Sequence, residues 1–201
     1  MQKIGIKLDP NKLKKFNDLG FIFIEKFIIN LDKLYSLYLD FYDLMIENEI
    51  TLADISKKKN ILHIGCGSIP STSILLVKKT GVQVTAIDRN PRSVDHARLC
   101  LSKTGFSDKI QILYGDAKTF PVDNFDIIII SLGVKPIEEI LKRIAKSMKD
   151  DAHVIFRTSS LPNGEIAKND LFIKDFFNIE KVVEQKKNAL LISILLSKRK
   201  T

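Results

Sequence analysis

The sequence has no tryptophan, two cysteines and three histidines among its 201 residues. Two thiols in a chain of this length are too few for a disulfide framework, and no Cys or His pair has the spacing of a zinc site. No apolar run is long enough to cross a membrane, and the polar opening segment MQKIGIKLDPNKLKK does not resemble a signal peptide. We therefore expect a cytoplasmic protein without a metal centre and without a membrane partner.

Acidic residues are also fewer than basic ones, which leaves a formal net charge of +8. A charge of this sign is compatible with an anionic partner such as nucleic acid or acidic lipid. The lysines are spread along the chain, however, and they form runs only at residues 57–59 and 198–200. Short runs of this kind are typical of solvated ends of elements, so the charge does not predict a nucleic-acid partner. Assembly as a homodimer stays open.

The hydropathy pattern changes near residue 60. Before it, apolar residues recur at steps of three and four, which predicts helices over roughly residues 10–55. After it, short apolar strands alternate with helices, a pattern that predicts a mostly parallel sheet with helices on both faces. The expected strands are 61–64, 83–87, 110–114, 125–130 and 153–156, and the expected helices run from the turn after the first strand to 79, over 91–103 and over 137–148. We expect a small N-terminal helical region over 1–57 and an α/β domain over 58–201.

Two further strands, at residues 181–185 and 190–196, are separated by only a few residues. A parallel crossover needs a dozen or more residues, so these two strands must form an antiparallel pair. The predicted fold class is therefore α/β, with a doubly wound, mostly parallel seven-stranded sheet that ends in an antiparallel C-terminal hairpin.

Residue types that bind ligands follow successive strands of the expected sheet. The first strand ends in Gly65 and Gly67, which let the backbone approach a ligand and aim free N–H groups at it. Asp88 ends the second strand, where a carboxylate can accept hydrogen bonds from both hydroxyls of a ribose. Asp116 ends the third strand and can meet the exocyclic amine of an adenine, and Ser131 follows the fourth. Packing glycines, a helix N-cap and a Gly-Asp turn are the structural alternatives, but together these residues predict an adenosine site.

The cofactor of such a site is either a dinucleotide or S-adenosylmethionine (SAM). A dinucleotide fingerprint has a third glycine where this chain has Pro70, and a proline hinders the close approach of a pyrophosphate. SAM has no phosphate and tolerates this residue. The second carboxylate and the antiparallel closing pair also favour SAM, because such a pair distinguishes SAM-dependent methyltransferases from dehydrogenases.

With these features the chain resembles the class I SAM-dependent methyltransferases over residues 58–199, which implies a Rossmann-like methyltransferase fold. The segments HIGCGSIPSTSILLVKKTG, IDRNPRSVDHARLCL and ILKRIAKSMKDDAHVIFRTSS are similar to segments of nicotianamine synthases. That resemblance implies SAM binding at the glycines and aspartates named above, and a substrate near Arg157, Thr158 and Ser159. True nicotianamine synthases have a larger N-terminal helical domain. The candidates for their catalytic glutamate, which lie in the corresponding stretch, are Asp40, Asp43 and Glu47.

The leading hypothesis is methyl transfer from SAM to a small molecule. The alternatives are aminopropyl (3-amino-3-carboxypropyl) transfer, as in nicotianamine synthases, and a SAM- or adenosine-binding module without catalysis. The segment after the fourth strand, residues 131–134, lacks the Asn/Asp-Pro-Pro-Tyr type of loop that acts on nucleobase amines. This difference argues against a nucleic-acid acceptor.

The acceptor is expected at the carboxyl edge of the sheet, under the N-terminal helices. Tyr38 and Tyr42 either line its pocket or belong to the core, since they lie on one helical face. Arg157 either attracts an acceptor carboxylate with its planar fork or pairs with an acidic residue of a neighbouring loop. His63 lies within a buried strand and Cys66 within the glycine turn, and we expect both to have structural roles.

Overall fold

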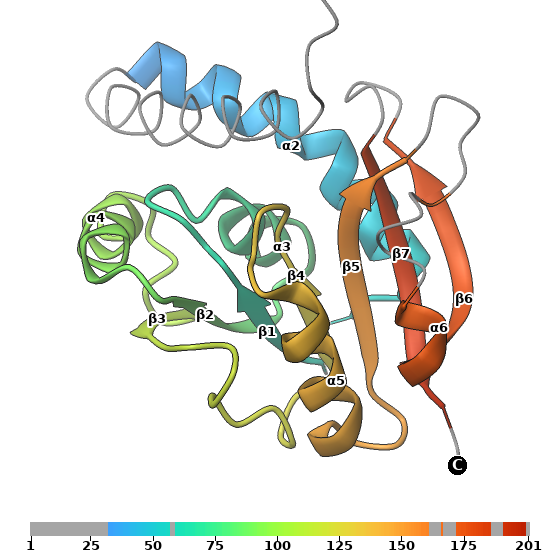
Figure 1. Cartoon of the computed structure of the whole chain (residues 1–201). Coiled ribbons are helices and arrows are strands. Elements are labelled where there is room, and N and C mark those ends of the chain that lie inside the picture. Colours follow the sequence, from blue (N-terminus) through green and yellow to red (C-terminus); the bar gives the residue numbers. More distant parts are fainter. Residues whose placement is uncertain (1–31, 57–58, 161–165, 167–171, 186–190, 200–201) are drawn as a thin grey trace, which may run out of the picture.

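The computed structural model describes residues 32–56, 59–160, 166, 172–185 and 191–199 (Figure 1). Its centre is a seven-stranded sheet with the strand order β3-β2-β1-β4-β5-β7-β6. The strands are β1 (Asn60–Ile64), β2 (Gln83–Asp88), β3 (Ile110–Tyr114), β4 (Ile127–Ile130), β5 (His153–Ser159), β6 (Phe177–Glu184) and β7 (Leu191–Lys198). The helices are α2 (Asp32–Leu52), α3 (Ser71–Thr80), α4 (Pro91–Leu101), α5 (Ile137–Ser147) and the short α6 (Ile173–Phe176).

Neighbouring strands from β1 to β5 are parallel, whereas β7 is antiparallel to both β5 and β6. The predicted doubly wound sheet with an antiparallel C-terminal pair is therefore confirmed. Every residue of β4 is buried, which explains its continuous isoleucine run, because a central parallel strand is covered on both faces. The edge strand β6 is mostly exposed and carries charged side chains, which is typical of an edge that must not pair with other chains.

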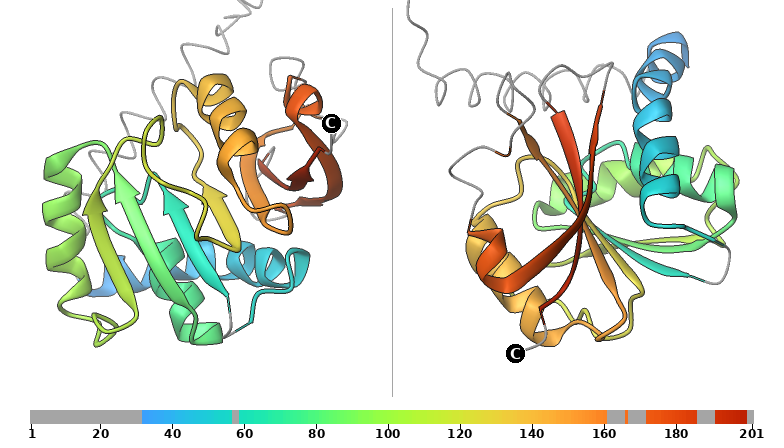
Figure 2. Two further views of the ribbon diagram at one scale, coloured as in Figure 1. Left: turned by 90° about the horizontal axis from the view of Figure 1, so that it is seen from below. Right: turned by 90° about the vertical axis from the view of Figure 1, so that its right-hand side faces the viewer.

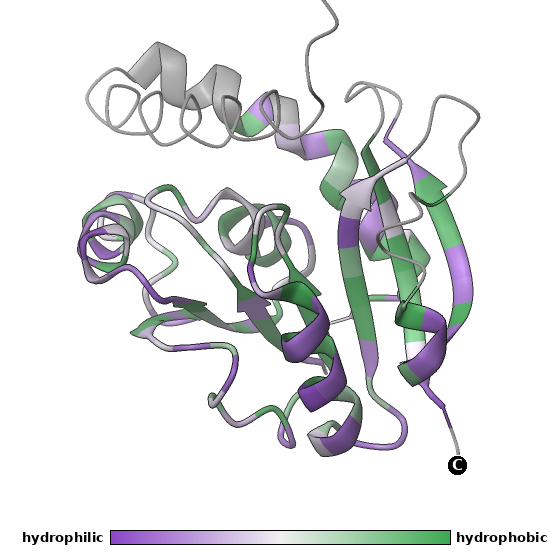
Figure 3. Ribbon diagram, in the orientation of Figure 1, coloured by the Kyte–Doolittle hydropathy of each residue, from purple (hydrophilic) through white to green (hydrophobic). Residues whose placement is uncertain are grey.

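Helices α2, α3 and α4 cover one face of the sheet, and α5 and α6 cover the other (Figure 2). Each face has its own apolar core, because alternate residues of each strand point to opposite sides. Hydrophobic residues concentrate along the central strands and hydrophilic ones on the outward side of α5 (Figure 3). None of the described helices combines the length and the apolar character that a membrane crossing needs.

Helix α2 is the described part of the N-terminal helical region. It packs across α3, and its residues Met45, Ile46 and Leu52 belong to the same apolar core as the sheet. This contact places α2 beside the sheet, on the face that α3 covers (Figure 2). The expected helices over residues 10–31 lie outside the described residues.

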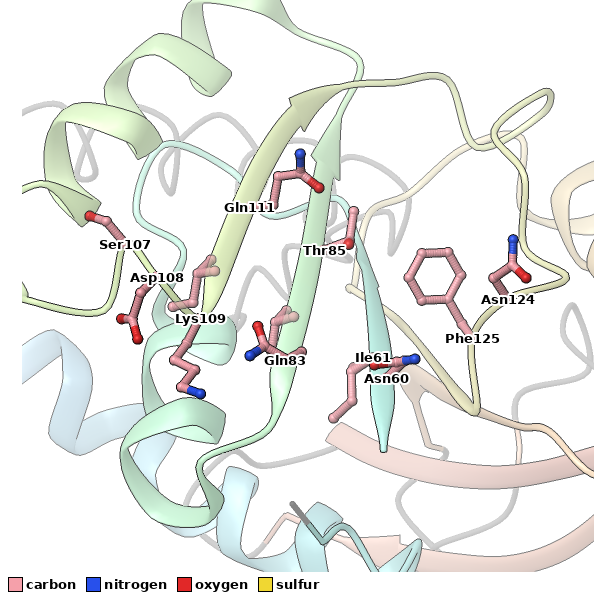
Figure 4. Close-up of a pocket in the computed structure, with 12 residues that line it drawn as sticks. Asn60, Ile61, Gln83, Thr85, Ser107, Asp108, Lys109, Gln111, Asn124 and Phe125 are labelled. Carbon is pink, nitrogen blue, oxygen red and sulfur yellow. The ribbon is translucent and has the colours of Figure 1, made fainter. Parts of the chain in front are cut away.

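Among the described elements, no helix lies over the amino-terminal halves of β1, β2 and β3 on the face that α5 and α6 cover elsewhere (Figure 2). Residues 115–126, which connect β3 to β4, form turns rather than the helix that a doubly wound sheet usually carries there. A pocket of about 480 Å³ lies on this open face, and Thr85, Gln111 and Phe125 are among its lining residues (Figure 4). The pocket is at the opposite end of the strands from the predicted adenosine site.

Candidate functional site

The turn after β1 is held against the end of β2 by its backbone. Gly65 and Gly67 both have positive φ values, 79° and 65°, a region that favours glycine. The N–H groups of Gly65 and Cys66 donate to the carbonyl of Ile87, at 2.9 and 3.1 Å. A Cβ atom added to Gly65 would lie 2.6 Å from Cγ2 of Val134, so both the backbone and its surroundings require glycine at this position.

Asp88 joins this turn to the start of the next helix. Its Oδ2 accepts the N–H of Gly67 at 3.0 Å, and its Oδ1 accepts the N–H of Asn90 at 2.9 Å. The capping of α4 falls to Asn90, whose side chain accepts the N–H of Arg92. A carboxylate oxygen has more than one acceptor site, so the half-buried Asp88 keeps acceptor capacity toward the carboxyl edge.

Asp116 and Ser131 lie at the same edge as Asp88. The N–H of Gly115 donates to the carbonyl of Asp88 at 3.1 Å, which brings the end of β3 beside the end of β2. Asp116 uses Oδ1 to accept the N–H of Lys118, and within the described residues its Oδ2 makes no hydrogen bond. Ser131 donates its N–H to the carbonyl of Ile64 at 3.1 Å. The structure thus brings Gly65, Gly67, Asp88, Asp116 and Ser131 together, while their role in binding stays a prediction.

His63 is buried one residue before the end of β1. Its Nδ1 lies 2.9 Å from the hydroxyl of Ser73 on α3, and its Nε2 lies 2.9 Å from the hydroxyl of Ser131. Burial, together with the nearby positive charge of Arg157, lowers the pKa of His63 to about 3. The structure thus shows His63 as a buried histidine with a hydrogen-bond partner at each ring nitrogen.

Arg157 is almost completely buried, with 4% of its side chain exposed, and it faces Glu49 of α2, which is fully buried. Its Nε and Nη2 donate to the two carboxylate oxygens of Glu49 at 2.8 and 2.7 Å, and its Nη1 donates to the hydroxyl of Thr72 at 2.9 Å. Ser193 of β7 donates to the same carboxylate at 2.6 Å. Of the two expectations for Arg157, the structure contains the salt bridge, although its partner lies on a helix and not in a loop. An acceptor carboxylate would have to replace Glu49.

Two of the carboxylates proposed as catalytic, Asp43 and Glu47, are paired with a lysine of α3. Asp43 and Glu47 both pair with Lys79 near the end of α3, each at 2.8 Å, and Asp40 is exposed on α2. Hydrogen bonds and charge from Asp43 and Glu47 raise the pKa of Lys79 despite its partial burial. Lys79 thus holds Asp43 and Glu47 at the end of α3 that is opposite to the glycine turn, and their catalytic role, like that of Asp40, stays a prediction.

Tyr42 is partly buried and packs against the core that α2 shares with α3, which matches its core interpretation. The side chain of Tyr38 lies outside the described residues.

Sequence reasoning missed Glu49, the buried carboxylate of α2. A signal for it exists, because Glu49 follows Met45 by four residues and precedes Leu52 by three, which places an acidic residue on the apolar face of the helix. Glu49 is linked to the carboxyl edge by its ion pair with Arg157. Arg157 also lines a small cavity of about 40 Å³, together with Ser131 and Phe156.

The arrangement fits an adenosine ligand in three respects. The glycine turn leaves the backbone free of side chains beside the strand ends, Asp88 is fixed by two backbone N–H groups, and Asp116 keeps an oxygen that no described residue occupies. Asp88 ends β2 and Asp116 follows the adjacent strand β3, so the two carboxylates lie side by side. The ribose and the adenine of one adenosine are also neighbours, so each can meet one carboxylate.

Residues 55–195 match the family model of a methyltransferase domain. Among curated proteins, an L-histidine 2-aminobutanoyltransferase from Yersinia pestis is 30% identical over 76 residues, which are 38% of this chain and 29% of that protein. A tRNA1(Val) (adenine(37)-N6)-methyltransferase from Actinobacillus pleuropneumoniae is 28% identical over 157 residues, 73% of this chain and 64% of that protein. The chain thus spans less than two thirds of the length of these relatives.

Among solved structures, a mutant of MtNAS in complex with S-adenosylmethionine aligns with a TM-score of 0.77 at 19% identity. The alignment covers 93% of this chain and 75% of that one. At this level of identity the likeness shows a shared fold.

Proposed function

The chain belongs to the methyltransferase domain family, and we propose that it transfers a methyl group from SAM to a small molecule. The observation that carries the proposal is the carboxylate of Asp88, which is oriented by the N–H groups of Gly67 and Asn90 beside a turn of positive-φ glycines. A carboxylate fixed in this way suits the two hydroxyls of a ribose.

The residues at the carboxyl edge divide the binding of SAM among them. Asp88 accepts the ribose hydroxyls, Asp116 accepts the amine of the adenine through its remaining oxygen, and the turn at Gly65 and Gly67 gives the ligand close access to the backbone. When bound, SAM supplies a methyl group on a sulfonium, which is already an activated leaving group. The protein therefore contributes mainly alignment of the acceptor and exclusion of water.

The acceptor belongs beside Ser131 and Phe156, where the small cavity lies. One relative is a tRNA methyltransferase by name, but residues 131–134 of this chain lack the Asn/Asp-Pro-Pro-Tyr type of loop that acts on nucleobase amines, which favours a small-molecule acceptor. Two cysteines in 201 residues are too few for the disulfide framework of an oxidising compartment, and we propose that the enzyme works in the cytoplasm.

A second candidate function is transfer of the aminopropyl group of SAM. It is supported by the similarity to a protein named as a 2-aminobutanoyltransferase, and by the buried carboxylate of Glu49 behind the edge. In this case the bond between the sulfur and the aminopropyl carbon breaks instead of the bond between the sulfur and the methyl carbon. The leaving group is then methylthioadenosine and not S-adenosylhomocysteine.

The two functions are separated by their by-products. The full-length protein is incubated with SAM and, in parallel, with the small-molecule, RNA and protein fractions of a cell extract. S-adenosylhomocysteine formed with the small-molecule fraction supports methyl transfer, whereas methylthioadenosine supports aminopropyl transfer. Asp88→Ala serves as the control, because weaker SAM binding should strongly reduce either product at limiting SAM. Binding of SAM with no product in any fraction would favour a binding module without catalysis, and tight binding of NADH without SAM would overturn the proposal.

A further inference from the structure

The imidazole of His63 lies between two serine hydroxyls that belong to different parts of the fold. Ser73 is on the buried side of α3, and Ser131 follows β4 at the carboxyl edge. Each ring nitrogen lies 2.9 Å from one hydroxyl oxygen, and His63 itself is 2% exposed. The ring cannot rotate without losing both contacts, so its orientation is fixed from the α3 side and from the β4 side.

Burial and the neighbouring Arg157 keep this imidazole neutral, because they lower the pKa of His63 to about 3. A neutral imidazole has one nitrogen that donates and one that accepts. Consequently one of the two serines must donate to the ring and the other must accept from it. The state of Ser73 is thereby linked to the state of Ser131 through the ring.

Ser131 is the member of this chain of contacts that reaches the site. Its N–H is bonded to the carbonyl of Ile64, and its Cβ would lie 3.5 Å from a Cβ atom added to Gly65, so it is immediately beside the glycine turn. It is half-buried and borders the small cavity that Arg157 also lines. His63, in contrast, is enclosed and has no access to a ligand.

We propose that His63 is a positioning residue that acts through Ser131, fixing the rotamer of its hydroxyl and deciding whether that hydroxyl donates to the bound ligand or accepts from it. A serine side chain otherwise samples three staggered rotamers, and its hydroxyl hydrogen rotates to suit any neighbour. Ser73 fixes the far side of the ring and so completes the arrangement. The identification of the ligand as SAM rests on the proposed function.

A double-mutant cycle on SAM affinity tests this coupling. Ser131→Ala and His63→Leu are each expected to weaken SAM roughly threefold to tenfold, the size of one hydrogen bond. The double variant should be no weaker than Ser131→Ala alone, because His63 then has no hydroxyl left to orient. If the two effects multiply, His63 acts independently of Ser131 and the proposal is wrong. His96→Gln, a substitution of the half-buried histidine on α4, is the matched control and should leave the affinity unchanged.

A second readout does not depend on SAM and covers the case in which His63→Leu fails to fold. Ring ¹⁵N chemical shifts are recorded on the wild type, on Ser73→Ala and on Ser131→Ala. A single neutral tautomer of His63 in the wild type, with a mixture of tautomers in Ser131→Ala, supports the proposal. Averaged tautomers in the wild type would overturn it. The wild type could bind no SAM and still have a single tautomer that depends on Ser131. That result would contradict the proposed function but would support the link between His63 and Ser131.

Discussion

The carboxylate of Glu49 receives the guanidinium of Arg157 with both oxygens, across 108 residues of sequence. This buried pair joins α2 to β5, and Thr72 and Ser193 add hydrogen bonds from α3 and β7. A pair of this kind costs desolvation energy, but the loss of one partner costs more, because it leaves an unpaired charge in the interior. The pair therefore fixes the position of α2 on the sheet.

Removal of Glu49 should be strongly destabilising. We expect Glu49→Ala to lower the free energy of unfolding by about 3–5 kcal/mol, as is typical when one member of a buried ion pair is lost. Glu47→Ala, on the same helix, is the matched control. Its exposed pairing with Lys79 should be worth less than about 1 kcal/mol. Urea unfolding of both variants measures the difference, and equal losses would mean that the Arg157 pair is not a structural link.

The two glycines with similar φ values but different surroundings allow a second prediction. Gly105→Ala, at φ 74° with no atom within 4 Å of the added Cβ, should cost only the left-handed strain of about 1–2 kcal/mol. Gly65→Ala, at φ 79°, carries the same strain and also a contact of 2.6 Å with Val134. Thermal unfolding should show the larger loss for Gly65→Ala, and SAM affinity should fall only in that variant. If the two variants lost the same stability and the same SAM affinity, Gly65 would have no special role in SAM binding.

Asp88 should contribute more to SAM binding than any single hydroxyl at the edge. Asp88→Ala is expected to weaken SAM on the order of 30-fold, about 2 kcal/mol, because the ribose contact and the anchoring of the Gly67 N–H are lost together. Asp95→Ala, an exposed carboxylate on α4, should leave binding unchanged. Calorimetry compares the two. A larger loss in His63→Ala than in Asp88→Ala would show that the ribose contact has been assigned wrongly.

Much of this edge could be predicted because its determinants are local. Gly65, Gly67, Asp88 and Asp116 each follow an apolar strand, and parallel strands necessarily end at one edge. Glu49 was missed because its role depends on Arg157, a partner that no local pattern reveals. No helix was predicted between β3 and β4, and residues 115–126 form turns there, because Pro121 and the Asp123–Asn124 pair interrupt that segment.

The contribution of His63 to stability can be measured from the pH dependence of the free energy of unfolding. Its pKa is lowered to about 3 in the folded protein, so between about pH 6.5 and pH 3 the unfolded chain binds a proton that the native protein does not. Stability is therefore lost as the pH falls through this window, by about 1.4 kcal/mol per pH unit from this one residue. We expect the wild type to lose roughly 2 kcal/mol more than His63→Gln between pH 7 and pH 5 in urea unfolding. Identical losses would mean that His63 is accessible to protons, which would contradict the enclosed ring between Ser73 and Ser131.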